Sequence, residues 1–171
     1  MSAAATAPRT ATAPPEEWEP GSMIVLVGPP ASGKSTWTQA RFPASARVSL
    51  DAFRQLLTDD EADQGANEEA LDLRARVLDG RLRRGRTTVC DSTSIEIAAR
   101  AGLLARARAY GRRAVAVRFD TPLEECLARN AARERTVREG VVRAMQTALP
   151  TVEELYAEGF DAVHHPGDTA P

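Results

Sequence analysis

A glycine-containing turn at residues 28–36, GPPASGKST, carries the most specific chemical signal in this chain. Its spacing follows G-x-x-x-x-G-K-[ST], a pattern typical of loops that wrap around phosphate groups. Gly28 and Gly33 permit backbone angles that side chains forbid, so that successive N–H groups can surround an anion. Lys34 is the only lysine among 22 basic residues. A flexible ammonium reaches two phosphates better than the larger arginine fork does.

The turn therefore predicts a site for the triphosphate of ATP. Lys34 is expected to bridge the β- and γ-phosphates, and the Ser35 hydroxyl to hold Mg²⁺. Thr36 is placed to contact the α-phosphate, and the helix that begins near Gly33 adds its positive N-terminal end. The residues expected to bind the cofactor are Gly28, Ala31, Ser32, Gly33, Lys34, Ser35 and Thr36.

Two aspartates follow the next two predicted strands. Asp51, in VSLDAFRQLL, can take the proton of an acceptor hydroxyl, and it can equally cap the helix that follows. Arg54 lies three residues later on the same helical face and is expected to bind a phosphate of the acceptor. Asp91, in TTVCDSTS, can order Mg²⁺ through water or orient Arg54, and the sequence does not choose between these roles.

The segment RNAARERTVR, residues 129–138, is rich in arginine. On a continuous helix Arg129 and Arg133 would be separated by four residues and would face the same way. We predict an Arg-rich helical lid that closes over ATP, in which both arginines neutralise charge on the transferred phosphoryl group. A solvated charged helix would show a similar pattern.

The order of the predicted elements indicates an α/β fold. Short apolar strands at 23–28, 46–50, 87–91, 113–120 and 160–165 alternate with amphipathic helices. This alternation predicts a three-layer arrangement, with a parallel sheet and helices on both faces. Ligands of such sheets bind beyond the carboxyl ends of the strands. The residues expected at that edge are Gly28, Asp51, Asp91 and Asp120.

Length and composition place these elements in one domain. The chain has 171 residues, and its net charge of −2 excludes a protein that wraps a polyanion over its whole surface. We expect a disordered leader at 1–21, a domain at 22–166 and a disordered tail at 167–171. Helix 68–85 ends in an arginine cluster, 81–86, that we interpret as a solvated helix end.

Several remaining residues are predicted to be structural. Cys90 and Cys126 are expected to be buried thiols of a reducing compartment, which favours a cytoplasmic protein without a membrane span. Trp37 is expected to pack against the sheet rather than stack on adenine. The adjacent pair His164 and His165 is expected to be solvated or to end a strand, with no role in binding a metal.

Taken with the phosphate turn, three further segments give the sequence a family resemblance. SLDAFRQLLTDDEADQ, VCDSTS and CLARNAARERTVR resemble the kinase module of bacterial polynucleotide kinase–phosphatase enzymes, over about residues 22–166. The resemblance implies a P-loop kinase sheet of order 2-3-1-4-5 and Mg²⁺-dependent transfer of the ATP γ-phosphate to a 5′-hydroxyl end of DNA or RNA. It also implies that Asp51 is the general base, that Arg54 contacts the acceptor's phosphate, and that Arg129 and Arg133 belong to the lid.

Two other interpretations stay open at this stage. The first is a P-loop kinase that phosphorylates a hydroxyl of a small molecule, such as a sugar, a nucleoside or an antibiotic. The second is a nucleotide-binding regulatory protein that hydrolyses little ATP, against which the combination of Lys34, Ser35 and Asp51 argues. The sequence alone does not indicate the oligomeric state.

Overall fold

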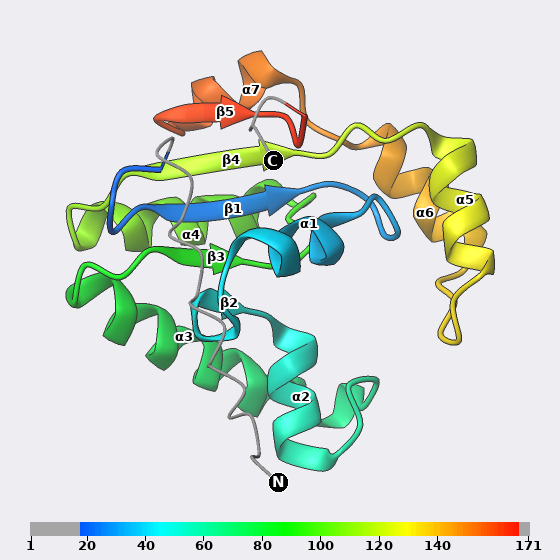
Figure 1. The fold of residues 1–171 in the computed structure, drawn as a ribbon, viewed down its shortest axis with the longest axis horizontal. Coiled ribbons are helices and arrows are strands. Elements are labelled where there is room, and N and C mark those ends of the chain that lie inside the picture. The colour runs from blue at the N-terminus through cyan, green and yellow to red at the C-terminus, as the bar shows by residue number, and fades with distance from the viewer. Residues whose placement is uncertain (1–17, 168–171) are drawn as a thin grey trace, which may run out of the picture.

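A central sheet of five parallel strands organises the protein, which we describe from a computed structural model that covers residues 18–167 (Figure 1). The strand order is β2-β3-β1-β4-β5, which confirms the predicted order 2-3-1-4-5. The strands are β1 (Met23–Val27), β2 (Arg47–Val48), β3 (Thr88–Cys90), β4 (Ala114–Arg118) and β5 (Ala162–His164). The parallel register places the carboxyl ends of all five strands at one edge of the sheet.

Seven α-helices and two short 3₁₀ turns complete the described part of the chain. The α-helices are α1 (Lys34–Arg41), α2 (Leu50–Thr58), α3 (Asn67–Arg83), α4 (Ile97–Ala109), α5 (Leu123–Ala131), α6 (Glu139–Thr147) and α7 (Val152–Glu158). The 3₁₀ turns are η1 (Ala44–Ala46) and η2 (Gln64–Ala66). None of the helices within residues 18–167 is long and apolar enough to cross a lipid bilayer.

The two faces of the sheet bury separate apolar clusters, as the period of a strand requires. Along β1, Met23, Val25 and Val27 face a cluster that includes residues of α3, α4 and α7. Ile24 and Leu26 face the opposite cluster, which is built around the ring of Trp37 from α1. Helices therefore cover both faces of the sheet, as predicted, and Trp37 packs against the sheet as expected.

The ordered domain extends further toward the N-terminus than the expected boundary at residue 22. Trp18, which we expected in the leader, is only 3% exposed. Its ring packs edge-to-face against Trp37, with centroids 6.2 Å apart, and against His164, with centroids 5.2 Å apart. Residues 1–17 of the expected leader and 168–171 of the expected tail lie outside the described residues.

Two local predictions for Asp51 at the carboxyl edge of the sheet were wrong. β2 ends at Val48 and α2 starts at Leu50, so Asp51 lies in the first turn of a helix and not at the end of a strand. Ser49, and not Asp51, occupies the N-cap position of that helix. Asn67 is the first residue of α3, and its side chain accepts a hydrogen bond from Arg54.

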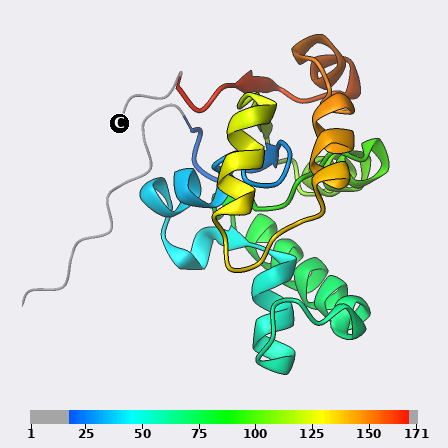
Figure 2. The same cartoon turned by 90° about the vertical axis from the view of Figure 1, so that its right-hand side faces the viewer.

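The arginine-rich segment does not form one continuous helix. α5 ends at Ala131, and the chain then runs without helix to Glu139, so that Arg129 and Arg133 do not share a helical face. Asn130 explains the break, because its side chain donates to the carbonyl of Val137 and accepts from the amide of Val137, over 2.7 and 3.0 Å. α5, this loop and α6 form an arm beyond the carboxyl ends of the strands (Figures 1 and 2).

Candidate active site

The phosphate turn lies between β1 and α1 and is shaped by two close approaches. A Cβ at Gly28 would come within 2.7 Å of Cβ of Phe119, so the backbone passes β4 at a distance that only glycine permits. Gly33 has a φ of 98° and forms the N-cap of α1, where its missing side chain leaves space beside the guanidinium of Arg129. The turn that the spacing predicted is therefore present, with a strand before it and a helix after it.

Lys34 is the first residue of α1, and its ammonium points back into the turn. Its Nζ donates to the carbonyl oxygens of Gly28 and Pro29, over 2.9 and 2.6 Å, and to Oγ of Ser32 over 3.2 Å. Burial lowers the pKa of Lys34 to about 8, an effect that the negative charge of Asp91 opposes and the positive charge of Arg133 reinforces. The turn thus holds a desolvated cation at the base of the site.

Asp91 lies one residue beyond β3 and within electrostatic reach of this lysine. Burial raises its pKa, and the Ser35 hydroxyl and the Lys34 ammonium oppose this rise. The hydrogen-bonding and ion-pair partners of Arg54 do not include Asp91. The structure therefore associates Asp91 with Ser35 and Lys34, and it does not support the alternative in which Asp91 orients Arg54.

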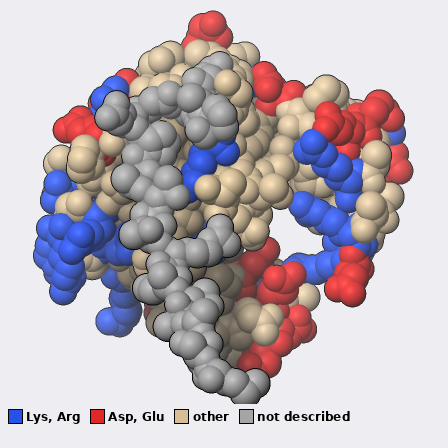
Figure 3. Space-filling model, viewed as in Figure 1, with Lys and Arg blue, Asp and Glu red and all other residues tan. Residues whose placement is uncertain are grey.

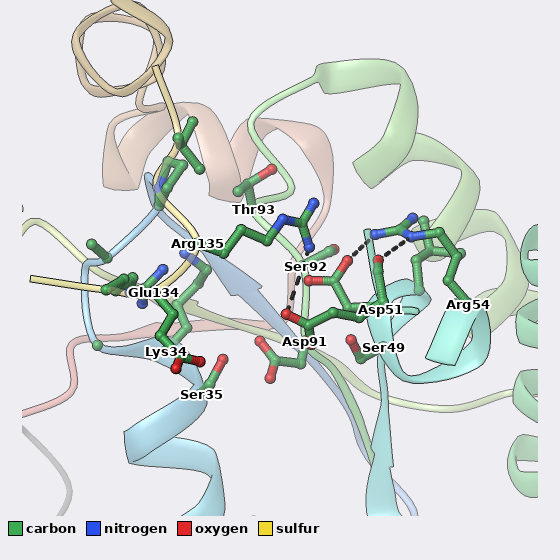
Figure 4. A pocket seen from close by; sticks show the side chains of 17 residues that line it. Lys34, Ser35, Ser49, Asp51, Arg54, Asp91, Ser92, Thr93, Glu134 and Arg135 are labelled. Carbon is green, nitrogen blue, oxygen red and sulfur yellow. Dashed lines mark hydrogen bonds and ion pairs between the residues drawn. The ribbon is translucent and has the colours of Figure 1, made fainter. Parts of the chain in front are cut away.

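A cavity of about 600 Å³ opens from the phosphate turn toward α2 (Figure 4). Asp51 lines its far side, and its side chain remains 57% exposed. The side chain is therefore neither turned away from the cavity nor closed off from solvent. A carboxylate and a phosphate cradle thus face each other across a space that can admit a hydroxyl compound.

Arg54 occupies an internal position behind Asp51. The residue is 6% exposed, and its guanidinium pairs with the carboxylate of Asp51. Its Nε donates to the carbonyl of Glu61 over 2.7 Å, and its Nη1 donates to Oδ1 of Asn67 over 2.8 Å. Arg54 consequently connects α2, the loop that follows it, and the start of α3.

The arm supplies the arginines of the opposite wall. Arg133 and Arg135, both in the loop between α5 and α6, line the cavity. Nη1 of Arg135 lies 3.6 Å from a carboxylate oxygen of Glu61, so that an ion pair joins the arm to the α2–α3 loop. Arg129 pairs with Glu125 on its own helix and lies beside Gly33 without lining the cavity. In Figure 3 basic and acidic side chains border the hollow between the arm and the α2 side.

The cavity gathers most of the residues that the sequence predicted for the site. Eight of them line it, namely Ala31, Gly33, Lys34, Ser35, Asp51, Arg54, Asp91 and Arg133, whereas Gly28, Ser32, Thr36 and Arg129 do not. Asp120 does not belong to the lining either, because its carboxylate pairs with Arg118 and His165.

Sequence reasoning missed six polar residues of the lining: Ser49, Glu61, Ser92, Thr93, Glu134 and Arg135. Thr93 directly follows the Asp91–Ser92 pair, and Arg135 belongs to the arginine run, so both lay within segments that the sequence had singled out. Ser49 and Glu61 flank α2 and also lie within a segment quoted for the resemblance, 49–64, but no role was predicted for either residue. Only the loop geometry brings them to the cavity.

Fold and site together define a P-loop kinase. The chain belongs to the AAA_33 family, described as an AAA domain, whose model matches residues 23–152. No curated protein matches the chain.

Cys90 and Cys126 are free and buried, and residues 18–167 contain no group of three or more His, Cys, Asp or Glu side chains arranged to hold a metal ion.

Solved structures share the fold at low sequence identity. One is a chain in the structure of the Pnkp1/Rnl/Hen1 RNA repair complex, with a TM-score of 0.66 and 22% identity; the match covers 82% of this chain and 46% of that one. This chain therefore spans about half the length of that protein. A gluconokinase from Sinorhizobium meliloti 1021 (TM-score 0.52, 15% identity) is matched over 86% of this chain and 83% of its own. The tunicamycin resistance protein of Deinococcus radiodurans (TM-score 0.51, 15% identity) is matched over 84% and 85%.

Proposed function

We propose that the protein transfers the γ-phosphate of ATP to a 5′-hydroxyl end of DNA or RNA, with Mg²⁺ as cofactor. The observation that carries this proposal is the exposed carboxylate of Asp51, which faces the phosphate cradle across the cavity. A carboxylate in that place can accept the proton of an entering hydroxyl as its oxygen attacks the γ-phosphorus. The likeness to a chain of an RNA repair complex agrees with a polynucleotide acceptor.

Other residues of the cavity have roles consistent with this reaction. Lys34 binds the β- and γ-phosphates, and Arg133 compensates the charge that spreads over the transferred group. The hydroxyl of Ser35 and the carboxylate of Asp91 form a donor set that suits Mg²⁺, which takes one or two carboxylates together with phosphate oxygens and water. When bound, the ion would neutralise charge on the phosphates. Arg129, beside Gly33, remains a candidate for contact with the nucleotide.

A small-molecule acceptor is the second candidate. It is favoured by the internal bonding of Arg54, which leaves the wall near Asp51 without a free cation from α2. The shape likeness to a gluconokinase and to an antibiotic resistance protein fits this candidate as well. The phosphate cradle and the role of Asp51 would be the same in both cases.

An acceptor panel distinguishes the two candidates. The protein is incubated with γ-labelled ATP and Mg²⁺, and with 5′-hydroxyl oligonucleotides, nucleosides or sugars as acceptors. Label on oligonucleotides supports the proposal, whereas label on sugars alone would contradict it.

The Asp51→Asn variant tests the general base. It should lower kcat by about 10²–10⁴ while ATP still binds, because an amide cannot accept the proton. The control is Asp72→Asn, which changes an exposed carboxylate of α3 outside the cavity. Unchanged transfer by Asp51→Asn would remove this residue as the base.

A further inference from the structure

A polynucleotide acceptor brings a negative charge into the cavity beside its hydroxyl. The terminal sugar of a 5′-hydroxyl strand carries the first phosphate at its 3′ position, so this phosphate enters together with the attacking oxygen. The acceptor side of the site therefore needs a cation that is free to bind it. The cations that line the cavity are Lys34, Arg54, Arg133 and Arg135, and the first belongs to the phosphate turn.

Arg54 is poorly suited to this task in spite of its position. Each of its three guanidinium nitrogens already has an acceptor, in Glu61, Asn67 and Asp51. A phosphate that displaced one of these acceptors would leave it unpaired, and an unpaired buried polar group costs about 1–3 kcal/mol. The bonding instead fixes the carboxylate of Asp51 relative to α3.

Arg135 has the opposite properties. Its side chain is 46% exposed and extends from the arm across the cavity toward the side where Asp51 and Arg54 lie (Figure 4). Within residues 18–167 its ion-pair partner is Glu61, at 3.6 Å, and the Glu61 side chain is about half exposed as well. An exposed pair of this kind contributes no more than about 1 kcal/mol, so a phosphate can replace the carboxylate and gain a bidentate contact.

Glu61 lies beside Asp51 because of Arg54. The Nε of Arg54 holds the backbone carbonyl of Glu61, so the Glu61 side chain starts next to Arg54 and lines the cavity on the same side as Asp51. Arg135 therefore meets a carboxylate on the side of the cavity where Asp51 would receive the acceptor's hydroxyl and its neighbouring phosphate.

We propose that Arg135 binds the first phosphate of the acceptor strand in exchange for Glu61, and that Arg54 is a positioning residue for Asp51. This inference rests on the proposed function, because a phosphate-free acceptor would have no use for Arg135. It assigns recognition of the acceptor's phosphate to the loop between α5 and α6, residues 132–138, rather than to α2.

Two acceptors that differ by one phosphate test the assignment. The acceptors are a nucleoside 3′-monophosphate and the same nucleoside without phosphate, each with a free 5′-hydroxyl. Arg135→Ala should raise KM for the phosphorylated acceptor by about 10- to 100-fold, as expected for loss of a charged hydrogen bond. Its KM for the nucleoside should stay within about twofold of wild type. Arg143→Ala is the control, since Arg143 is similarly exposed and pairs with Glu139 on α6, away from the cavity.

Two more variants separate binding from positioning. Glu61→Gln should lower KM for the phosphorylated acceptor alone, because it releases Arg135 without changing the size of the side chain. Arg54→Lys should lower kcat for both acceptors, because a lysine cannot hold Asp51 and the Glu61 carbonyl together. A KM increase confined to the phosphorylated acceptor in Arg54→Lys, with none in Arg135→Ala, would overturn the assignment and leave the proposed function standing.

A binding measurement keeps the assignment testable if neither acceptor is phosphorylated. That outcome would count against the proposed function. Calorimetric titration of nucleoside 3′-monophosphate into the protein with ADP and Mg²⁺ then decides the assignment. A loss of affinity of tenfold or more in Arg135→Ala supports it, whereas equal affinities, or no binding by the wild type, overturn it.

Discussion

The buried ammonium of Lys34 can be titrated directly, because Lys34 is the only lysine of the chain. Protein labelled with ¹³C-lysine should give a single Cε resonance, whose change in chemical shift with pH reports the pKa of this one group. We expect a midpoint near 8, since burial in the phosphate turn lowers the pKa from its usual value of 10.5 to about 8. Addition of ATP and Mg²⁺ should raise the midpoint, because the phosphates favour the charged form.

The size of this effect follows from the two pKa values. The two values differ by about 2.5 pH units. At 1.36 kcal/mol per unit, the charge on Lys34 lowers the free energy of unfolding by about 3 kcal/mol. Because the pKa is lower in the folded than in the unfolded chain, the unfolded chain binds more protons between pH 8 and 10.5. Stability should therefore rise with pH across this window, and the cost should be fully present only below pH 8.

Lys34→Met isolates this contribution from other titrating groups. At pH 7 the variant should unfold with a free energy at least equal to that of the wild type, although it loses the contacts of Nζ with Gly28, Pro29 and Ser32. From pH 7 to 9.5 the free energy of unfolding of the wild type should rise by about 2 kcal/mol relative to that of the variant. Urea denaturation at each pH measures this difference. The variant should have lost phosphate transfer. A Cε midpoint close to 10.5 in the free protein would refute the reasoning, because the turn would then not desolvate the ammonium.

Three further substitutions test the frame around the site. Trp18→Ala should lower the free energy of unfolding by about 3–5 kcal/mol in urea denaturation, because Trp18 is buried; a loss below 1 kcal/mol would place this ring outside the core. Arg100→Met leaves the carboxylate of Glu158 without its partner, so the free energy of unfolding should fall by about 3–5 kcal/mol in the same measurement. An unchanged free energy of unfolding would show that the pair adds no net stability. Gly28→Ala places a methyl group 2.7 Å from Cβ of Phe119, so ATP affinity measured by calorimetry should fall at least tenfold, and unchanged affinity would show that the turn can shift.

The phosphate turn could be predicted because all its determinants are local. Gly28, Gly33, Lys34 and Ser35 lie within eight residues, between an apolar strand and a helix, and no distant contact is needed to specify their arrangement. The alternation of strands and helices was equally visible, since each buried strand is a short apolar run. The order of the strands came from the family resemblance, and the fold confirms it.

The arm could not be predicted in the same way, because its shape depends on one side chain. The spacing of Arg129 and Arg133 fits a helix, and nothing in the charge pattern indicates an interruption. The side-chain amide of Asn130 nevertheless hydrogen-bonds to both the N–H and the C=O of Val137. These two bonds close a loop that brings Arg133 and Arg135 to the cavity. Hydrogen bonding between a polar side chain and the backbone competes here with helix propagation, and the loop is the outcome.

Arg54 shows that charge and spacing alone do not reveal which partners a side chain already has. A charged side chain near a site is readily assigned to the substrate. The guanidinium of Arg54, however, is buried and already donates to Asp51, Asn67 and the Glu61 carbonyl. Its contacts fix the carboxylate of Asp51 before any acceptor arrives, so the geometry of the base does not depend on which acceptor enters. Under our proposal, the choice of acceptor then depends on groups that can exchange partners, which on this side of the cavity are the Arg135 guanidinium and the Glu61 carboxylate.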